Sequence, residues 1–108
     1  MELEFRFDGL VDDLEDGVAD VQVGDLGVAD SPDIVGRVSV GPFPVSSTNP
    51  SVRVDVDLPP VAGTYEPGLV VSVRGRSGGD EVEFFNIRET PLPESPAGPV
   101  QVVLSRIR

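Results

Sequence analysis

The sequence predicts an all-β protein, folded as an antiparallel β-sandwich of about seven strands. Apolar and polar residues alternate at a period of two in several short stretches, as in strands with one buried face. Twelve glycines and 11 prolines separate these stretches, and no window shows the period of a helix. Because 108 residues can bury a core without metal or disulfide support, we expect residues 1–108 to form a single domain.

The first strand is expected over residues 3–7, where Leu3, Phe5 and Phe7 alternate with charged residues and Gly9 ends the pattern. An acidic turn segment follows at Asp12–Gly17. The second strand places Ala19, Val21 and Val23 on one face and ends near residues 25–27. A loop at residues 29–33 has the composition of a turn.

The third strand is expected over residues 34–40. Residues Gly41-Pro42-Phe43-Pro44 should stop it, because proline cannot donate a hydrogen bond to a neighbouring strand. After a loop at residues 46–50, Ser51–Leu58 shows the clearest alternation in the chain, with four apolar residues on one face: Val52, Val54, Val56 and Leu58. Pro59-Pro60 should end this strand.

A hairpin is the strongest single feature of the sequence. Residues 69–74 and 82–87 are rich in β-branched and aromatic residues, and the turn Ser77-Gly78-Gly79-Asp80 lies between them. The apolar phase changes between Phe84 and Phe85, which indicates a bulge or a strand covered on both faces.

A proline-rich connection over residues 91–99 leads to a last strand, which carries Val100, Val102 and Leu104. Together these elements favour a sandwich of the immunoglobulin or transthyretin type.

The chain is strongly acidic, with 19 Asp and Glu against eight basic residues, all of them Arg, and a net charge of −11. Such a charge repels phosphates and anionic lipids, so nucleic acid and membrane-surface partners are not expected. Adaptation to salt is an alternative reading of the acidic, lysine-free surface, and it would leave the role of the domain open.

Cysteine and histidine are both absent, which excludes disulfides, thiol chemistry and the usual zinc sites. The chain begins Met1-Glu2-Leu3-Glu4, unlike a signal peptide, and no apolar run is long enough to span a bilayer. As written, the sequence therefore suggests a cytoplasmic protein.

Two groups of carboxylates are candidate binding or catalytic sites. The run Asp12–Gly17 invites calcium, but Leu14 and Val23 occupy positions where a helix–loop–helix calcium site needs ligands, so a solvated turn is favoured. Asp55 and Asp57 lie on one strand face about 7 Å apart, a spacing that could suit a pair of catalytic carboxylates. Because they alternate with apolar valines, we interpret them as the solvent-exposed face of that strand.

Two further patterns lie at the hairpin. Gly75–Gly79 matches the G-x-S-x-G nucleophile motif, but it falls on a strand-to-strand turn in a chain without histidine. Three arginines around the hairpin (Arg74, Arg76 and Arg88) are expected to pair across strands with Glu81, Glu83 or Glu89. We therefore assign no catalytic, cofactor-binding or metal-binding residue, and we expect no cofactor and no enzymatic activity.

Four stretches of the sequence together carry a family pattern: Ala19-Asp20-Val21-Gln22-Val23-Gly24-Asp25-Leu26 with Ala29-Asp30-Ser31-Pro32, Leu58-Pro59, Leu69-x-Val71-x-Val73, and residues 99–107. They resemble the YbaY/YscW family of pilotin-like lipoproteins linked to type III secretion. The resemblance covers residues 17–108 and implies a β-sandwich without catalytic residues. Family members act as outer-membrane pilots or assembly chaperones, which implies a periplasmic or cell-envelope location if a signal segment was removed. Leu69 stands where the family usually has Tyr.

The sequence thus predicts a non-catalytic protein-binding or assembly-chaperone module that recognises a protein segment through an exposed edge strand. The alternative is a structural subunit that self-associates through its edge strands. The sequence does not define the oligomeric state or name the partner.

Overall fold

The computed structural model describes residues 2–25, 33–57, 67–86, 90–91 and 98–107, and among these residues there is no helix. The strands are β1 (Glu2–Asp8), β2 (Leu14–Asp25), β3 (Asp33–Val45), β4 (Ser51–Asp55), β5 (Pro67–Ser77), β6 (Asp80–Phe85), β7 (Thr90–Pro91) and β8 (Val100–Arg106). The predicted all-β class is confirmed.

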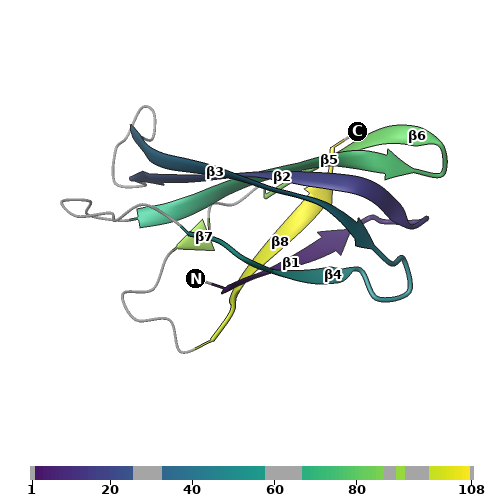
Figure 1. The fold of residues 1–108 in the computed structure, drawn as a ribbon, viewed down its shortest axis with the longest axis horizontal. Coiled ribbons are helices and arrows are strands. Elements are labelled where there is room, and N and C mark those ends of the chain that lie inside the picture. Colours follow the sequence, from purple (N-terminus) through teal and green to yellow (C-terminus); the bar gives the residue numbers. More distant parts are fainter. Residues whose placement is uncertain (1, 26–32, 58–66, 87–89, 92–97, 108) are drawn as a thin grey trace.

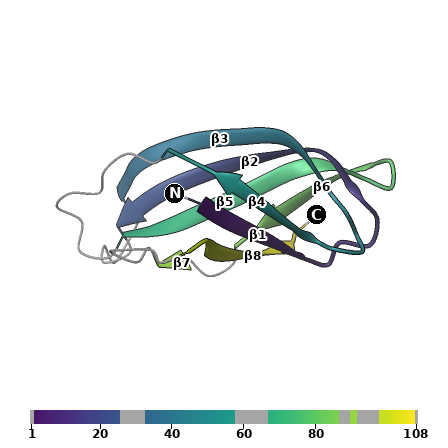
Figure 2. The same ribbon diagram turned by 60° about the horizontal axis from the view of Figure 1, so that its bottom comes forward.

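All the strands belong to one mixed sheet, ordered β3-β2-β5-β6-β8-β1-β4, with β7 pairing to β5 off this path. The sheet folds over itself, so that β1 and β4 lie in front of β2 and β5 in Figure 2. This arrangement is a single, nearly barrel-shaped sheet rather than the two antiparallel sheets of the predicted sandwich. The prediction of purely antiparallel pairing is wrong, because β1 and β8 are parallel from Leu3↔Val100 to Asp8↔Ser105.

The core lies between the two layers of the folded sheet. The alternating apolar residues of β1 (Leu3, Phe5 and Phe7) are at most 3% exposed. The Phe7 ring packs edge-on against Phe84 of β6, with their centroids 5.1 Å apart, which joins the β1 layer to the β5–β6 layer. Figure 1 shows these layers, with β3, β2 and β5 above β8, β1 and β4.

The hairpin forms as predicted. β5 and β6 pair from Ser72↔Phe85 to Ser77↔Asp80, and both turn residues, Gly78 and Gly79, have positive φ. No register shift interrupts this pairing, so of the two alternatives given for the phase change, a bulge is absent from it. The inner face simply continues through Val82, Phe84 and Asn86, all of them buried, while Phe85 is half-buried.

Three predicted boundaries were wrong. β2 starts at Leu14, inside the segment read as an acidic turn, because Leu14 is buried and pairs with Val45. β3 continues through residues 41–44 to Val45. It can do so because β3 is an edge strand, on which a proline need not donate to a neighbour.

The third wrong boundary is the end of β4 at Asp55, although Val56 beyond it is buried. Several predicted features fall outside the described residues. They are the loop at 29–32, Leu58 with Pro59-Pro60, Ile87, and most of the 91–99 connection.

Candidate functional site

Over the part of the chain that the structure describes, the folded sheet does not close. β3 and β4 are the two ends of its strand order, and a turn joins them, in which Ser46 and Asn49 form an isolated bridge. Asp13 supports this turn, because its Oδ1 accepts a hydrogen bond from the Ser47 backbone N–H at 2.8 Å. An end strand presents unpaired N–H and C=O groups, so both edges are candidate binding surfaces.

Four valines line the inner side of these edges: Val38 and Val40 of β3, and Val52 and Val54 of β4. All four pack against the core but remain partly exposed, whereas Val21 and Val71 in the middle of the sheet are fully buried. We call these four residues the seam. The core reaches solvent at the seam because an edge strand lacks a neighbour on one side.

The hydrogen bonds of a buried asparagine show which neighbouring strand the backbone groups of β5 face. Asn86 is 2% exposed and follows the end of β6. Its Oδ1 accepts from the Val71 N–H at 2.8 Å, its Nδ2 donates to the Leu69 carbonyl at 2.9 Å, and its own N–H donates to the Val71 carbonyl at 3.3 Å. The backbone of Val71 is therefore turned toward β6 and away from β2.

Because successive residues of a strand turn their N–H and C=O groups to opposite neighbours, the orientation of Val71 fixes the orientation of the residues that pair with it in turn, as far as the edge strand β3. Val21 lies opposite Val71, so its N–H and C=O turn toward β3, where its partner is Val38. Val38 in turn faces β2. The two residues that flank it, Arg37 and Ser39, therefore direct their backbone N–H and C=O groups outward, along the free edge.

The outer face of β3 carries an ion pair. Arg37 binds Asp20 of β2 through two contacts, Nε to Oδ1 at 2.8 Å and Nη2 to Oδ2 at 2.6 Å. The hydrogen bond and the charge of Asp20 raise the pKa of the Arg37 guanidinium. A hollow of about 500 Å³ lies beside this pair and includes Ser39, Ser72 and Arg74 in its lining.

At the carboxyl end of β3, acidic and apolar side chains lie next to each other. Glu15, Asp16, Pro42, Phe43 and Pro44 line a hollow of about 350 Å³ there. Gly17 is the register partner of Phe43, which places the exposed carboxyl-bearing residues of the β2 start beside the prolines.

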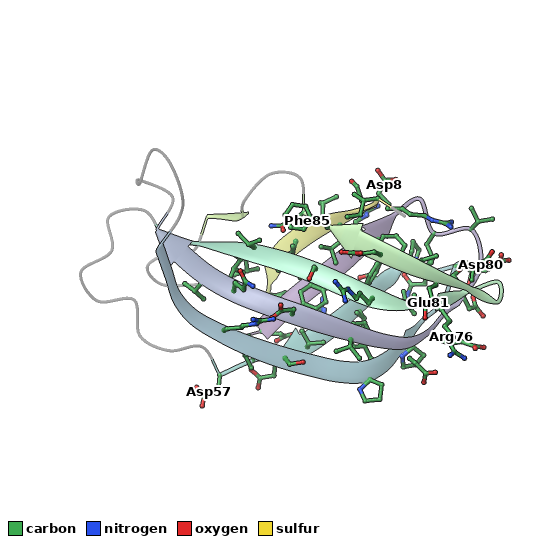
Figure 3. All side chains as sticks on the ribbon, turned by 90° about the horizontal axis from the view of Figure 1, so that it is seen from above. Asp8, Asp57, Arg76, Asp80, Glu81 and Phe85 are labelled. Carbon is green, nitrogen blue, oxygen red and sulfur yellow. The ribbon has the colours of Figure 1, made fainter. Side chains whose placement is uncertain are left out.

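The carboxylates singled out in the sequence are not gathered into a metal centre. Among the described residues, no group of three or more acidic side chains is placed to hold a metal ion. Asp55 and Asp57 are both exposed, and Figure 3 shows Asp57 at the opposite end of the molecule from Arg76, Asp80 and Glu81.

The hairpin patterns have structural roles. Ser77 lies on the strand-to-strand turn as predicted, and its hydroxyl donates to the Asp12 carbonyl at 2.9 Å. Arg74 pairs with Glu83 across the strands at 4.0 Å, and Arg76 is the register partner of Glu81, as the cross-strand reading predicts. Arg88 and Glu89 lie outside the described residues.

Sequence reasoning did not single out the seam or Asn86. An alternating pattern identifies the inner face of a strand, but it does not tell an end strand from a central one. Asn86 follows Val82 and Phe84 at the same spacing, which is the one signal that could have marked it as an inward residue.

Neither a family model nor a curated protein matches the sequence. Among solved structures, the chain is similar to an alternative pilotin from the type II secretion system of Vibrio cholerae. The two are 13% identical, with a TM-score of 0.50, and the match covers 100% of this chain and 97% of that one. The fold is pilotin-like. At this identity the likeness extends to the fold alone. No helix of the described residues is long and apolar enough to cross a membrane.

Proposed function

We propose that this chain is a non-catalytic protein-binding module with an assembly role, and that it takes up a strand of its partner at an open edge of its sheet. The observation that carries this proposal is the seam, where apolar side chains of both end strands are left partly exposed. A strand added at this place would cover them and would pair with free backbone groups. The pilotin-like fold supports a role in protein interaction at this general level.

Membership of the YbaY/YscW family is part of the same proposal and rests on the motifs in residues 17–108. A place in the cell envelope would follow from it. A non-catalytic role is supported by Ser77, whose hydroxyl is engaged by the backbone carbonyl of Asp12.

The proposal can be tested without knowing the partner. A random peptide library is displayed on phage and selected against the immobilised protein, and the enriched peptides are then mapped by NMR chemical shifts. We expect them to perturb the amides of β3 or β4 and the methyl groups of the seam. Enrichment no better than on an unrelated acidic protein, or shifts confined to residues away from both edges, would overturn the proposal.

Self-association through the same edges is the second candidate, because free edges also pair with copies of themselves. The net charge of −11 opposes it, since two copies repel each other. Sedimentation velocity over a wide range of concentration separates the two. A constant sedimentation coefficient supports partner binding, and growth with concentration supports the structural subunit.

A further inference from the structure

We infer that the partner strand binds along β3 between Gly36 and Val40, and that it is an extended segment of alternating apolar residues with basic residues at the end that lies over Glu15 and Asp16. This inference rests on the proposed function and specifies its edge and its ligand. Four observations lead to it: the free backbone groups, the seam, the place where the edge stops, and the charge.

The edge of β3 is longer and more open than that of β4. From Gly36 to Val40, β3 pairs with β2 without a register shift, and Arg37 and Ser39 direct their backbone groups outward. β4 has five residues, and the N–H of its first residue, Ser51, already donates to the Asn49 carbonyl at 2.7 Å.

Within β4, two residues beyond Ser51 have backbone groups that turn outward in the same way, Arg53 and the last residue, Asp55. The Phe7 N–H donates to the Pro50 carbonyl, so Phe5, two residues earlier in β1, also faces β4 and pairs with Val52. Arg53 follows Val52 and turns outward. Its side chain is held on the outer face, where Nε lies 3.1 Å from an oxygen of Glu4. A short edge occupied by a charged side chain is a poor template for strand addition.

The seam fixes the apolar pattern of the ligand. A strand paired with β3 places every second side chain on the same face as Val38 and Val40. Those side chains would cover the exposed parts of both valines and extend toward Val52 and Val54 on the other edge. The ligand therefore carries apolar residues at alternate positions, while the residues between them lie on the outer face beside Arg37.

The pairing must stop after Val40. Gly41 has a φ of 130°, and Pro42 and Pro44 have no N–H to offer a new strand. Beyond this point the ligand meets the hollow lined by Glu15, Asp16 and residues 42–44.

That hollow matches a lysine or arginine side chain. The prolines and Phe43 can cover the aliphatic stem, while the carboxylates of Glu15 and Asp16 attract the charged head. The net charge of −11 also favours a basic ligand over a second copy of this chain. Charge complementarity thus identifies the occupant as a basic, β-forming protein segment.

The test uses synthetic peptides with valines at alternate positions and lysines at the amino or the carboxyl end, because either strand direction can pair with an edge. The controls are the same peptides with glutamates in place of the lysines, and a scrambled lysine peptide without the alternation. Binding to the full chain is measured by calorimetry and mapped by NMR.

Two proline variants separate the edges. Ser39→Pro removes an outward N–H from β3, and Arg53→Pro is its match on β4; melting curves confirm that each variant is folded. We expect Ser39→Pro to lower the affinity of the protein for the lysine peptide at least about tenfold. Arg53→Pro should leave that affinity within about twofold of the wild-type value. The double variant Glu15→Gln/Asp16→Asn should lower the affinity for the lysine peptide about fivefold to tenfold, and it should leave the affinity for the scrambled control peptide unchanged.

Each contrary result has its own meaning. Loss of binding in Arg53→Pro but not in Ser39→Pro would overturn the β3 assignment, while the proposed function would stand. If the glutamate peptides bind as tightly as the lysine peptides, the inference that the ligand is basic is wrong. If the designed peptides fail but the phage selection yields peptides that map to an edge, only this inference is wrong. If the selection fails as well, the proposed function is wrong.

Discussion

Replacement of Asn86 by alanine should destabilise the protein strongly, although the residue lies outside every strand. The Asn86 side chain satisfies the N–H of Val71 and the carbonyl of Leu69, two residues that are fully buried. Asn86→Ala leaves both groups without a partner, and each unsatisfied group costs about 1–3 kcal/mol. The expected loss is therefore about 2–6 kcal/mol, a large part of the roughly 5–15 kcal/mol that stabilises a typical domain.

Urea unfolding measures this loss. With an m value of about 2 kcal/mol/M, the urea midpoint of Asn86→Ala should fall by about 1–3 M. Asn86→Leu retains the volume without the hydrogen bonds, so it should be about as unstable as the alanine variant. Gln101→Ala is the exposed control, since it removes an amide that donates to the Glu4 carboxylate at 3.2 Å on the surface. An Asn86→Ala variant within about 0.5 kcal/mol of wild type, or recovery of stability by leucine, would refute the reasoning.

Three further predictions concern the backbone, pH and salt. Gly41→Ala should lower the free energy of unfolding, measured by thermal denaturation, by about 2–4 kcal/mol, because Gly41 has a φ of 130° and a Cβ there would collide with the Gly17 carbonyl. Gly79→Ala should lower it by only about 1 kcal/mol, because Gly79 has a positive φ but a Cβ there would lie in open space. The hydrogen bond from the Ser47 backbone lowers the pKa of Asp13 below 3.8, so this carboxylate contributes stability that is present above that value and lost as pH falls through the lowered pKa. Asp13→Asn should therefore lose less stability than wild type during acid titration, and identical titrations would contradict the assignment. Because the net charge of −11 makes the surface repel itself, the melting temperature should rise in molar KCl, and a flat response would also remove the salt-adaptation reading.

The strands were predictable from sequence where one face is uniformly apolar. Leu3, Phe5 and Phe7 define β1, and the paired glycines Gly78 and Gly79 define the hairpin turn, because both signals are local and do not depend on the rest of the fold.

The order of the strands was not predictable in the same way. The parallel pairing of β1 with β8 joins residues near the two ends of the chain, and alternation within each strand contains no information about that neighbour. For the same reason the sequence alone predicts that the strand stops at Pro42 and Pro44. A proline ends a central strand but is tolerated on an edge, and the position of β3 at an edge is a property of the whole sheet.

The candidate site follows from this topology. Val38 and Val40 look like ordinary core residues in the sequence, and only the end position of β3 leaves them partly exposed. The acidic segment Asp12–Gly17, for which the sequence predicts a turn, likewise lies beside Phe43 only because β2 pairs with β3.

Amide hydrogen exchange along β3 of the free protein tests the central claim most directly. The amides of Val38 and Val40 should be protected, because they face β2, whereas those of Arg37 and Ser39 should exchange at nearly unprotected rates. If Arg37 and Ser39 are protected as strongly as Val38, the edge is already paired and cannot receive the strand of a partner.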